Sequence, residues 1–518
     1  MYRHTKLTYL NIYFIVFVLF INACTKLPIN LNKPYTKAFN DTSKTTLNKK
    51  LKPLLKKHKG KSGFHLLHDN LDAFSSRILL IDAANKSIDA QYYAVEDQLT
   101  GKLFLKHLLD AANRGVRIRL LIDDLKTDGR DAMFAALDTH PNMSIKAFNP
   151  FSFRTFPSLN FLTEFKRLDR RMHNKSFNVD NIVTILGGRN IGDKYFSAST
   201  SLEFKDLDIM IVSTKISNQV SNIFDEYWND SYAYPFSKLH QHKADDPSLK
   251  DVNKALERYS QKNDNSIYAT HARKSNILKQ LKSKQLKFIW AKGNVYADSV
   301  KQAHMPRKEH RYSMAPKILT FANKSQKSIL IISPYFVPKH WGKNVFSDWI
   351  KRGIKVRIVT NSLASNDVYA THAGYVKYRK QLLRLGVEIY ELKSNRSSDE
   401  GGIKSNVSGL HAKSFIFDEK NIFIGSMNLD TRSIELNSDM GVLIKSTVLS
   451  KNMLYWINKN LTKMTYKVVL KHHRGFDKLI WIDYTSSNTK YYDTEPNVGF
   501  FKRMTIDVLK ILPIKDEL

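Results

Sequence analysis

Two motifs of this 518-residue chain place the same side chains at the same spacing. In each motif a histidine is followed two positions later by a lysine, five positions further on by an aspartate, and ten positions after that by an asparagine. The residues are His173, Lys175, Asp180 and Asn190 in the first motif, and His411, Lys413, Asp418 and Asn428 in the second. A single His-x-Lys pair carries no signal, but a doubled pattern with shared offsets indicates one site built from two repeated halves.

The residue types favour phosphodiester chemistry. One imidazole can attack phosphorus and form a phosphohistidine, while the other protonates the departing oxygen and then deprotonates the incoming alcohol. Lys175 and Lys413, with Asn190 and Asn428, can bind the non-bridging oxygens and neutralise the charge of the transition state. Because fixed cations supply this charge, we expect a centre that needs neither a metal ion nor another cofactor.

The spacing also predicts how these side chains are positioned. Two strands are expected in each motif, at 175–179 and 182–186 in the first and at 413–417 and 422–424 in the second. Residues two apart in a strand point to the same face, so each histidine should project beside its lysine. We expect Asp180 and Asp418 to support the turn between the two strands, and the glycines before each asparagine to return it to the site.

The repeat extends to the surrounding elements. The expected order is strand, helix and strand, at 87–95, 101–113 and 117–122 in the first half and at 328–337, 343–351 and 355–359 in the second. Each helix ends in an Arg-Gly pair, where glycine favours termination. Strands that alternate with helices indicate an α/β fold with a mixed sheet flanked by helices. We therefore predict two similar lobes that form one pseudo-twofold active site.

These patterns divide the chain into six parts. They are a signal peptide with a lipobox at 1–24, a basic linker at 25–60, a first lobe at 61–240, a connector at 241–284, a second lobe at 285–470, and a C-terminal extension at 471–518. From Lys44 to Lys61 the linker holds eight lysines and no acid, which predicts a solvated, disordered tether or a segment that adheres to anionic lipid. In the extension, apolar residues alternate with lysines from Phe500 onward. This pattern predicts an amphipathic helix, either in a membrane interface or docked on the core.

The first residues and the total charge bear on location and partners. A basic start and an apolar run from 7 to 23 precede Cys24, the one cysteine, in a pattern that resembles a bacterial lipobox. We expect Cys24 to carry a lipid anchor on the extracytoplasmic side of a bacterial membrane, with an uncleaved anchor helix as the alternative. The last four residues, Lys-Asp-Glu-Leu, are read as coincidence. A net charge of +34 implies an anionic partner, either acidic lipid or nucleic acid.

The doubled motif resembles the phospholipase D superfamily, which is named for paired His-x-Lys-x4-Asp motifs. The resemblance covers about 60–515, and several further segments are similar to the bacterial cardiolipin synthase C-like group. These segments are 167–175, 187–193, 224–229, 428–433 and 512–514. The resemblance implies a phosphohistidine route and phospholipid substrates.

The resemblance also implies roles for further residues. By the family's habit His173 is the nucleophile and His411 the acid and base, although the sequence is symmetric on this point. A carboxylate downstream of each motif usually orients a catalytic histidine; Asp208 fits this role in the first lobe and Asp439 in the second. Arg189 and Arg432 lie beside the two asparagines. Each is a candidate for holding the phosphate of the acceptor, with a structural salt bridge as the alternative.

Several functions remain open at this point. We expect a phosphatidyltransferase that makes cardiolipin from phosphatidylglycerol, with phosphatidylethanolamine or a second phosphatidylglycerol as donor. A secreted phospholipase D that releases phosphatidic acid is the alternative, and no residue decides between water and an alcohol as acceptor. A nuclease is disfavoured by the signal sequence, the lipobox and the amphipathic tail. A non-enzymatic nucleic-acid-binding protein is disfavoured by the intact motifs, so nucleic acid is not the expected partner.

Overall fold

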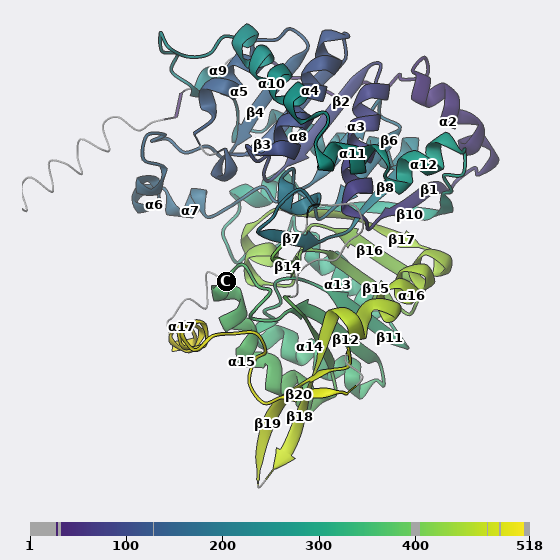
Figure 1. Cartoon of the computed structure of the whole chain (residues 1–518), viewed down its shortest axis with the longest axis vertical. Helices are drawn as coiled ribbons and strands as arrows, with labels where there is room; N and C mark the ends of the chain where they lie inside the picture. The colour runs from purple at the N-terminus through teal and green to yellow at the C-terminus, as the bar shows by residue number, and fades with distance from the viewer. Residues whose placement is uncertain are drawn as a thin grey trace, which may run out of the picture.

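The computed structural model describes residues 27–28, 33–127, 129–394, 403, 405–473, 475–485 and 488–511. Two α/β lobes lie one above the other in Figure 1, and each is built on a mixed sheet flanked by helices. The predicted fold class is therefore confirmed. Cys24 and the proposed signal segment lie outside the described residues, as does 512–514.

The two sheets repeat one strand order. Along the first sheet the neighbours are β1 (Ser62–Leu67), β8 (Asp208–Val212), β6 (Val183–Gly187), β5 (Ser176–Val179), β2 (Ser87–Tyr92), β3 (Arg117–Asp123), β4 (Met143–Phe148) and β9 (Ala233–Pro235). Along the second they are β10 (Ile289–Ala297), β17 (Met440–Lys445), β16 (Asn421–Gly425), β15 (Lys413–Phe417), β11 (Ser328–Ile332), β12 (Lys355–Asn361), β13 (Glu388–Leu392) and β18 (Thr465–His473). In each sheet three neighbouring strands run parallel to one another: β2, β3 and β4 in the first, and β11, β12 and β13 in the second. All other neighbours in these two orders run antiparallel, as βαβ units joined to hairpins require.

Three further pairings shape the molecule. The edge strands β1 and β10 pair with each other, so the two sheets are continuous across the lobe interface. The short strands β7 (Leu202–Lys205) and β14 (Val407–Leu410) pair in parallel, one from each lobe. The second sheet continues through β19 (Phe476–Asp483) to β20 (Lys490–Tyr492), and the hairpin of β18 and β19 projects from the bottom of the molecule in Figure 1.

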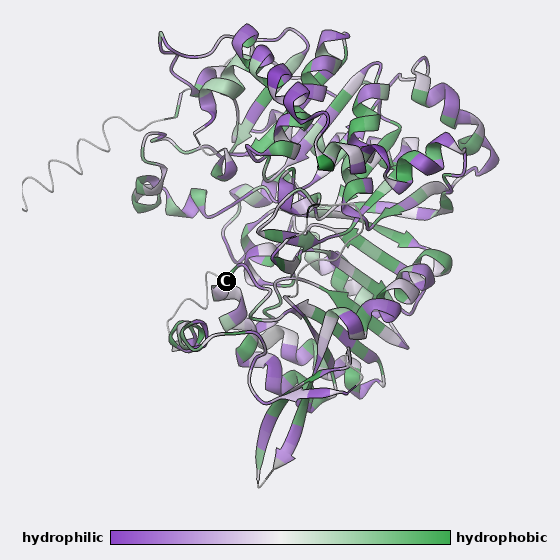
Figure 2. Ribbon diagram, viewed as in Figure 1, coloured by the Kyte–Doolittle hydropathy of each residue, from purple (hydrophilic) through white to green (hydrophobic). Residues whose placement is uncertain are grey.

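Helices cover the sheets, and Figure 2 shows hydrophobic colour concentrated in the strands with hydrophilic colour on the outer helices. In the first lobe and connector they are α2 (Thr46–Lys57), α3 (Asn70–Ala83), α4 (Leu99–Asn113), α5 (Asp131–Asp138), α6 (Asn160–Thr163), α7 (Phe165–Leu168), α8 (Thr214–Asn229), α9 (Phe236–Leu239), α10 (Leu249–Asn263), α11 (Ile267–Arg273) and α12 (Asn276–Lys282). In the second lobe they are α13 (Ala315–Asn323), α14 (Lys339–Lys351), α15 (Tyr369–Leu385), α16 (Thr447–Met464) and α17 (Phe500–Ile511). None of the helices in the described part of the chain is long and apolar enough to span a bilayer.

The basic segment before the first lobe is more ordered than its composition suggested. Residues 46–57 form α2, whose leucines recur every four positions and pack against the core of the first lobe. Before it, the backbone amides of Thr36 and Ala38 donate to Asn229 and Asp225 of α8. The expectation of a disordered tether is therefore wrong for this part, because a leucine stripe at helical spacing outweighs the surrounding lysines.

The connector and the tail both dock on the lobes. Helix α10 lies against α4, and α11 and α12 lie against α3. Helix α17 packs on α15 through Ile506, which is buried with Leu363 and Ala373. Its other face keeps Phe500 and Phe501 exposed to 70% and 77%. Docking of the tail on the core is therefore confirmed, and a second apolar face of the helix is left in solvent.

The aspartate of each motif fixes the chain before the central strand of its sheet. Asp180 accepts hydrogen bonds from the backbone amides of Asn85, Lys86 and Ser87, at the start of β2. Asp418 accepts the corresponding bonds from residues 326–328, at the start of β11. Both aspartates have positive φ in the hairpin turn. Each therefore joins its turn to a neighbouring loop.

This arrangement predicts different effects for two neighbouring residues of one turn. Asp418→Ala should lower the free energy of unfolding by about 1–3 kcal/mol, because it removes an ionised acceptor of several backbone hydrogen bonds. Glu419→Ala, the control, removes an exposed carboxylate at similar backbone geometry and should change stability little. Chemical denaturation at pH 7 measures both, and equal effects would contradict the assignment.

The same comparison should depend on pH. Burial opposes ionisation of Asp418, but its backbone hydrogen bonds prevail and hold its pKa below the usual 3.8. A carboxylate with a depressed folded pKa stabilises above its unfolded pKa, and this contribution is lost as pH falls through the folded pKa. The difference between the two variants should thus be present at pH 7 and shrink below about pH 4.

Candidate active site

The two histidines lie at the lobe interface, and each is held by backbone contacts with the opposite lobe. The amide of His173 donates to the carbonyl of Ser438 at 2.8 Å, and the amide of Ser438 donates back to Arg171 at 2.9 Å. The amide of His411 donates to the carbonyl of Lys205 at 2.9 Å, where β14 ends its pairing with β7. The structure therefore brings both motifs into one centre.

Asp439 binds His173 across this interface. Its Oδ1 lies 2.7 Å from Nδ1 of His173, and both side chains are buried. The carboxylate also accepts hydrogen bonds from the hydroxyls of Ser426 and Ser433. Burial favours the neutral acid, but attraction to His173 and these bonds outweigh it and lower the pKa of Asp439. The carboxylate is ionised at neutral pH, so it holds the Nδ1 proton and leaves Nε2 free.

The equivalent partner of His411 is Asp206, not Asp208 as expected from the sequence. Asp206 Oδ2 lies 2.6 Å from Nδ1 of His411. Burial opposes ionisation, yet attraction to His411 and hydrogen bonding with it lower the pKa of Asp206. Asp208 instead points into the first lobe, where its carboxylate pairs with Arg77 at 2.8 Å.

Strand register explains this correction. Asp208 begins β8 and pairs with Gly187, while Gly441 pairs with Gly425, the counterpart of Gly187 in the second motif. Asp208 and Gly441 are therefore equivalent, and the residues two positions earlier are Asp206 and Asp439. The sequence contains a signal for this equivalence. Aligning the apolar runs at 209–211 and 442–444 also matches Asp206 with Asp439.

Glycine is required where the first motif meets Asp206. A Cβ added to Gly188 would lie 2.2 Å from Oδ1 of Asp206, which no packing adjustment of a fixed carboxylate accommodates. The equivalent approach in the second motif is made by Ser426, whose hydroxyl donates to Asp439 at 2.6 Å. At this close contact the first lobe has a glycine without a side chain, and the second has a serine that hydrogen-bonds to the carboxylate.

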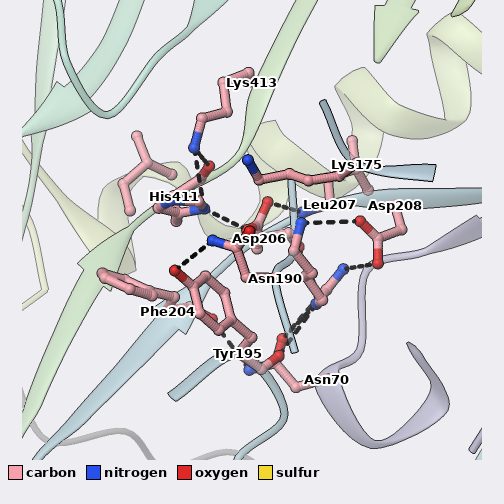
Figure 3. A network of polar contacts seen from close by, with 12 residues as sticks. Asn70, Lys175, Asn190, Tyr195, Phe204, Asp206, Leu207, Asp208, His411 and Lys413 are labelled. Atoms are coloured by element: carbon pink, nitrogen blue, oxygen red, sulfur yellow. Dashed lines mark hydrogen bonds and ion pairs between the residues drawn. The ribbon is translucent and has the colours of Figure 1, made fainter. Parts of the chain in front are cut away.

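The two motif lysines point toward one another beside the His411–Asp206 pair (Figure 3). Lys175 Nζ donates to the carbonyl of His173 at 2.8 Å, and Lys413 Nζ lies 3.0 Å from Nδ1 of His411. Burial, and then repulsion from Lys413, place the pKa of Lys175 well below 10.5. Burial lowers the pKa of Lys413 to about 8, against the attraction of Asp206 and Asp439. The centre therefore favours an incoming anion, which would stabilise the protonated form of both lysines.

The motif asparagines keep hydrogen-bonding capacity for a ligand. Asn190 donates to the hydroxyl of Tyr195 at 2.9 Å. The amide oxygens of Asn190 and Asn428 are buried and make no hydrogen bond with other described residues. Buried polar atoms without partners are rare and suit a site that completes its bonds on binding.

Both histidines are neutral in the free centre. Burial, and then the charge of Lys175, lower the pKa of His173 to about 4. Burial, and then the charge of Lys413, lower that of His411 to about 3. A neutral imidazole whose Nδ1 is bound to a carboxylate presents an Nε2 lone pair, which is the form that attacks phosphorus.

The two arginines proposed to hold a substrate phosphate have structural partners instead. Arg189 is fully buried and donates to Asn70 and to the backbone carbonyls of Leu67 and Asp206. It therefore fixes the loop that carries Asp206. Arg432 donates to the side chain and carbonyl of Asp169, which ties the second lobe to the first. Nη1 of Arg189 also lies 3.4 Å from Oδ2 of Asp208, so the salt-bridge alternative describes both residues.

Two buried acids near the centre were not anticipated from the sequence. Asp298 accepts a hydrogen bond from the amide of Asp439, and burial together with the charge of Asp439 raises the pKa of Asp298 to about 7. Burial raises the pKa of Asp430 to about 6. No periodicity marks either residue. Within the described ranges, no three His, Cys, Asp or Glu side chains gather as metal ligands would.

The register predicts opposite phenotypes for two nearby aspartates. Asp206→Asn should lower turnover of a soluble phosphodiester at least about 100-fold with little loss of stability, because it removes the acceptor that orients His411. Asp208→Asn should instead destabilise the fold by about 3 kcal/mol or more, because it leaves the buried Arg77 without its counter-charge. Turnover and thermal unfolding of both variants test this. A stable, inactive Asp208→Asn protein would restore the original assignment.

Comparison with known proteins agrees with this geometry. The family described as cardiolipin synthase, PLD-like domain, matches residues 78–228 and 318–461. The chain is 38% identical over 473 residues to cardiolipin synthase C of Escherichia coli K12, covering 89% of this chain and 98% of that protein. It is 30% identical over 511 residues to an uncharacterized protein of Helicobacter pylori 26695, covering 97% and 99%.

A solved structure shares the fold. The phosphatidylserine synthase of Haemophilus influenzae Rd KW20 superposes with a TM-score of 0.55 at 14% identity, covering 91% of this chain and 99% of that one. The two matched segments of the family correspond to the two lobes, and each contains one His-x-Lys motif. The chain belongs to the cardiolipin synthase-like branch of the phospholipase D superfamily and is an enzyme of that superfamily.

Proposed function

We propose that this enzyme transfers a phosphatidyl group to the glycerol headgroup of phosphatidylglycerol and so makes cardiolipin. The donor is phosphatidylethanolamine or a second phosphatidylglycerol. The observation that carries the proposal is the buried pair of neutral histidines, each oriented by a carboxylate of the other lobe. The similarity to cardiolipin synthase C over nearly its full length supports a phospholipid substrate.

In the first step Nε2 of His173 attacks the donor phosphorus. A P–N bond forms, the bond from phosphorus to the headgroup oxygen breaks, and His411 supplies the proton that the leaving alcohol needs. His411 is neutral in the free centre, but the negative charge of a bound phosphate raises the pKa of a nearby imidazole. Lys175 and Lys413 neutralise the charge on the non-bridging oxygens.

In the second step His411 takes the proton of the acceptor hydroxyl. The acceptor oxygen then attacks phosphorus, the P–N bond breaks, and His173 returns to its neutral form. Water in place of the alcohol gives phosphatidic acid, so hydrolysis is the same reaction with a different acceptor. Transfer requires the bound lipid alcohol to exclude water from the phosphohistidine.

We further propose that the enzyme acts at a bacterial membrane surface, on the extracytoplasmic side. Cys24 would carry the lipid anchor, and the mass of the mature protein tests this. Exposed apolar side chains occur on α17 and on the α6–α7 segment, which both lie at the left of Figure 1. They include Leu162 and Phe165 of the first lobe and Phe500 and Phe501 of the second. Such side chains suit burial at the headgroup boundary, and the net charge of +34 suits anionic lipid.

The reaction predicts a defined product. Purified enzyme in vesicles of phosphatidylethanolamine and phosphatidylglycerol, with EDTA present, should form cardiolipin, resolved by mass spectrometry. His173→Ala and His411→Ala should each lower the rate at least about 100-fold, because each removes half of the covalent and acid–base chemistry. Phosphatidic acid as sole product, with phosphatidylglycerol abundant, would convert the assignment to a hydrolase. Loss of all activity in EDTA, reversed by one divalent ion, would refute the metal-free route.

The exposed face of α17 predicts a separable effect on membrane binding. Phe500→Ser with Phe501→Ser should weaken binding to phosphatidylglycerol vesicles at least about tenfold, because burying one such side chain contributes about 1.5–3 kcal/mol. Phe476→Ser with Tyr491→Ser removes two aromatics of similar exposure from the β18–β20 region and is the matched control. Sedimentation with vesicles measures binding. Turnover of a soluble phosphodiester should not change, and equal losses in both double variants would exclude α17 as the contact.

A further inference from the structure

A groove of about 1170 Å³ runs between the lobes, away from the reacting side chains. Its walls come from α16 of the second lobe and from α12 and the chain around it, which lie on either side of β1 and β10 in Figure 1. The floor is apolar and includes Leu66, Ile332, Val359, Leu392, Leu410 and Met453. Protein interiors leave few voids larger than water, and pockets for drug-sized ligands span about 300–1,000 Å³. The groove therefore suits a larger apolar ligand.

The rim of the groove is basic on both sides. Lys274 and Lys279 line it from the connector, Lys287 from the chain just before β10, and Lys459 and Lys463 from α16. All five are exposed, and none takes part in an ion pair within the described part of the chain.

The acids that line the groove are already engaged. Asp69 accepts the capping hydrogen bond from the amide of Asp72 at the start of α3, and Asp206 holds His411. An apolar floor below a rim of cations recognises an amphiphile with an anionic head.

The groove shares one wall with the catalytic centre but opens on its opposite side. Leu410 and Ala412 line the groove, whereas His411 and Lys413 face the centre. Alternation along an extended segment produces this division. Asp206 contributes to both sides. A ligand in the groove is thus adjacent to His411 but contacts the other face of the segment that carries it.

We propose that this groove binds one anionic glycerophospholipid, with acyl chains on the apolar floor and the phosphate among the lysines of both walls. It is a site distinct from the phosphodiester under attack, and it does not depend on whether the centre transfers or hydrolyses. Acyl chains bring no polar group to the floor, whereas an extended peptide would bring backbone amides and carbonyls that these side chains leave unpaired.

Binding of a monomeric short-chain lipid tests the site directly. Dihexanoyl phosphatidylglycerol, titrated below its micelle concentration and followed by native mass spectrometry, should bind wild-type protein and the His173→Ala variant with the same number of equivalents, one of them in the groove and the rest in the catalytic centre. Dihexanoyl phosphatidylcholine should bind at least about tenfold more weakly, because it lacks net negative charge. Loss of the bound lipid in His173→Ala would place it in the catalytic centre and overturn the proposal.

Rim and floor variants complete the test. Lys279→Glu with Lys459→Glu and Lys463→Glu should weaken phosphatidylglycerol binding at least about tenfold. Lys324→Glu with Lys471→Glu and Lys490→Glu makes the same change of charge on exposed lysines elsewhere and should leave binding unchanged. Met453→Trp fills the floor and should also weaken binding, with thermal unfolding as the check on its fold.

Two results would overturn the assignment. One is equal lipid affinity in the rim and control triple variants, which would show that the rim lysines do not contact the phosphate. The other is an acidic amphipathic peptide that binds wild-type protein more tightly than the lipid and loses its affinity in the rim variant. That result would assign the groove to a protein partner.

Discussion

The structure depends on an exchange of carboxylates between the lobes. His173 of the first lobe is oriented by Asp439 of the second, and His411 of the second by Asp206 of the first. Neither lobe holds a complete catalytic half, so the centre exists only when the interface is closed. The pairing of β1 with β10 and of β7 with β14 makes that closure part of the sheets themselves. The two copies of the repeated fold thereby form one shared centre.

Burial of this interface sets the electrostatics of the centre. Two lysines face two ionised aspartates, and the histidines stay neutral because protonation would add buried positive charge. The charged form of Lys175 is disfavoured twice in this centre, by burial and by repulsion from Lys413. An incoming phosphate would stabilise the charged lysine, because it adds a negative charge beside it. Substrate binding and activation of the acid–base group therefore have the same physical cause, which is a counter-charge in a site shielded from water.

The repeated motifs and strands could be predicted from the sequence. Residue roles that depend on strand register or on tertiary contacts could not. Matching offsets placed both motifs, and alternating patterns located the strands around 87–95 and 117–122 within a few residues. Asp206 was missed because choosing between two aspartates two positions apart requires knowing which residue pairs with Gly187. The choice for Arg189 between a substrate phosphate and a structural salt bridge stayed open because exposure is invisible in a sequence, whereas the fold buries this residue completely. Helix α2 was missed because charge composition obscured its leucine stripe.

The two halves have diverged in their surroundings although their motifs match. His411 contacts the rings of Tyr195 and Phe204, while His173 contacts that of Tyr93. Burial and the charge of the neighbouring motif lysine nevertheless lower the pKa of both histidines, so the two imidazoles are perturbed in the same way. In the proposed mechanism, the division comes from the substrate, whose leaving oxygen faces one histidine when its phosphorus faces the other. Phosphatidyl transfer between two alcohols suits this arrangement, because the second step reverses the first with a new alcohol in the place of the old. One nucleophile and one acid–base group then serve both steps without any rearrangement of the protein.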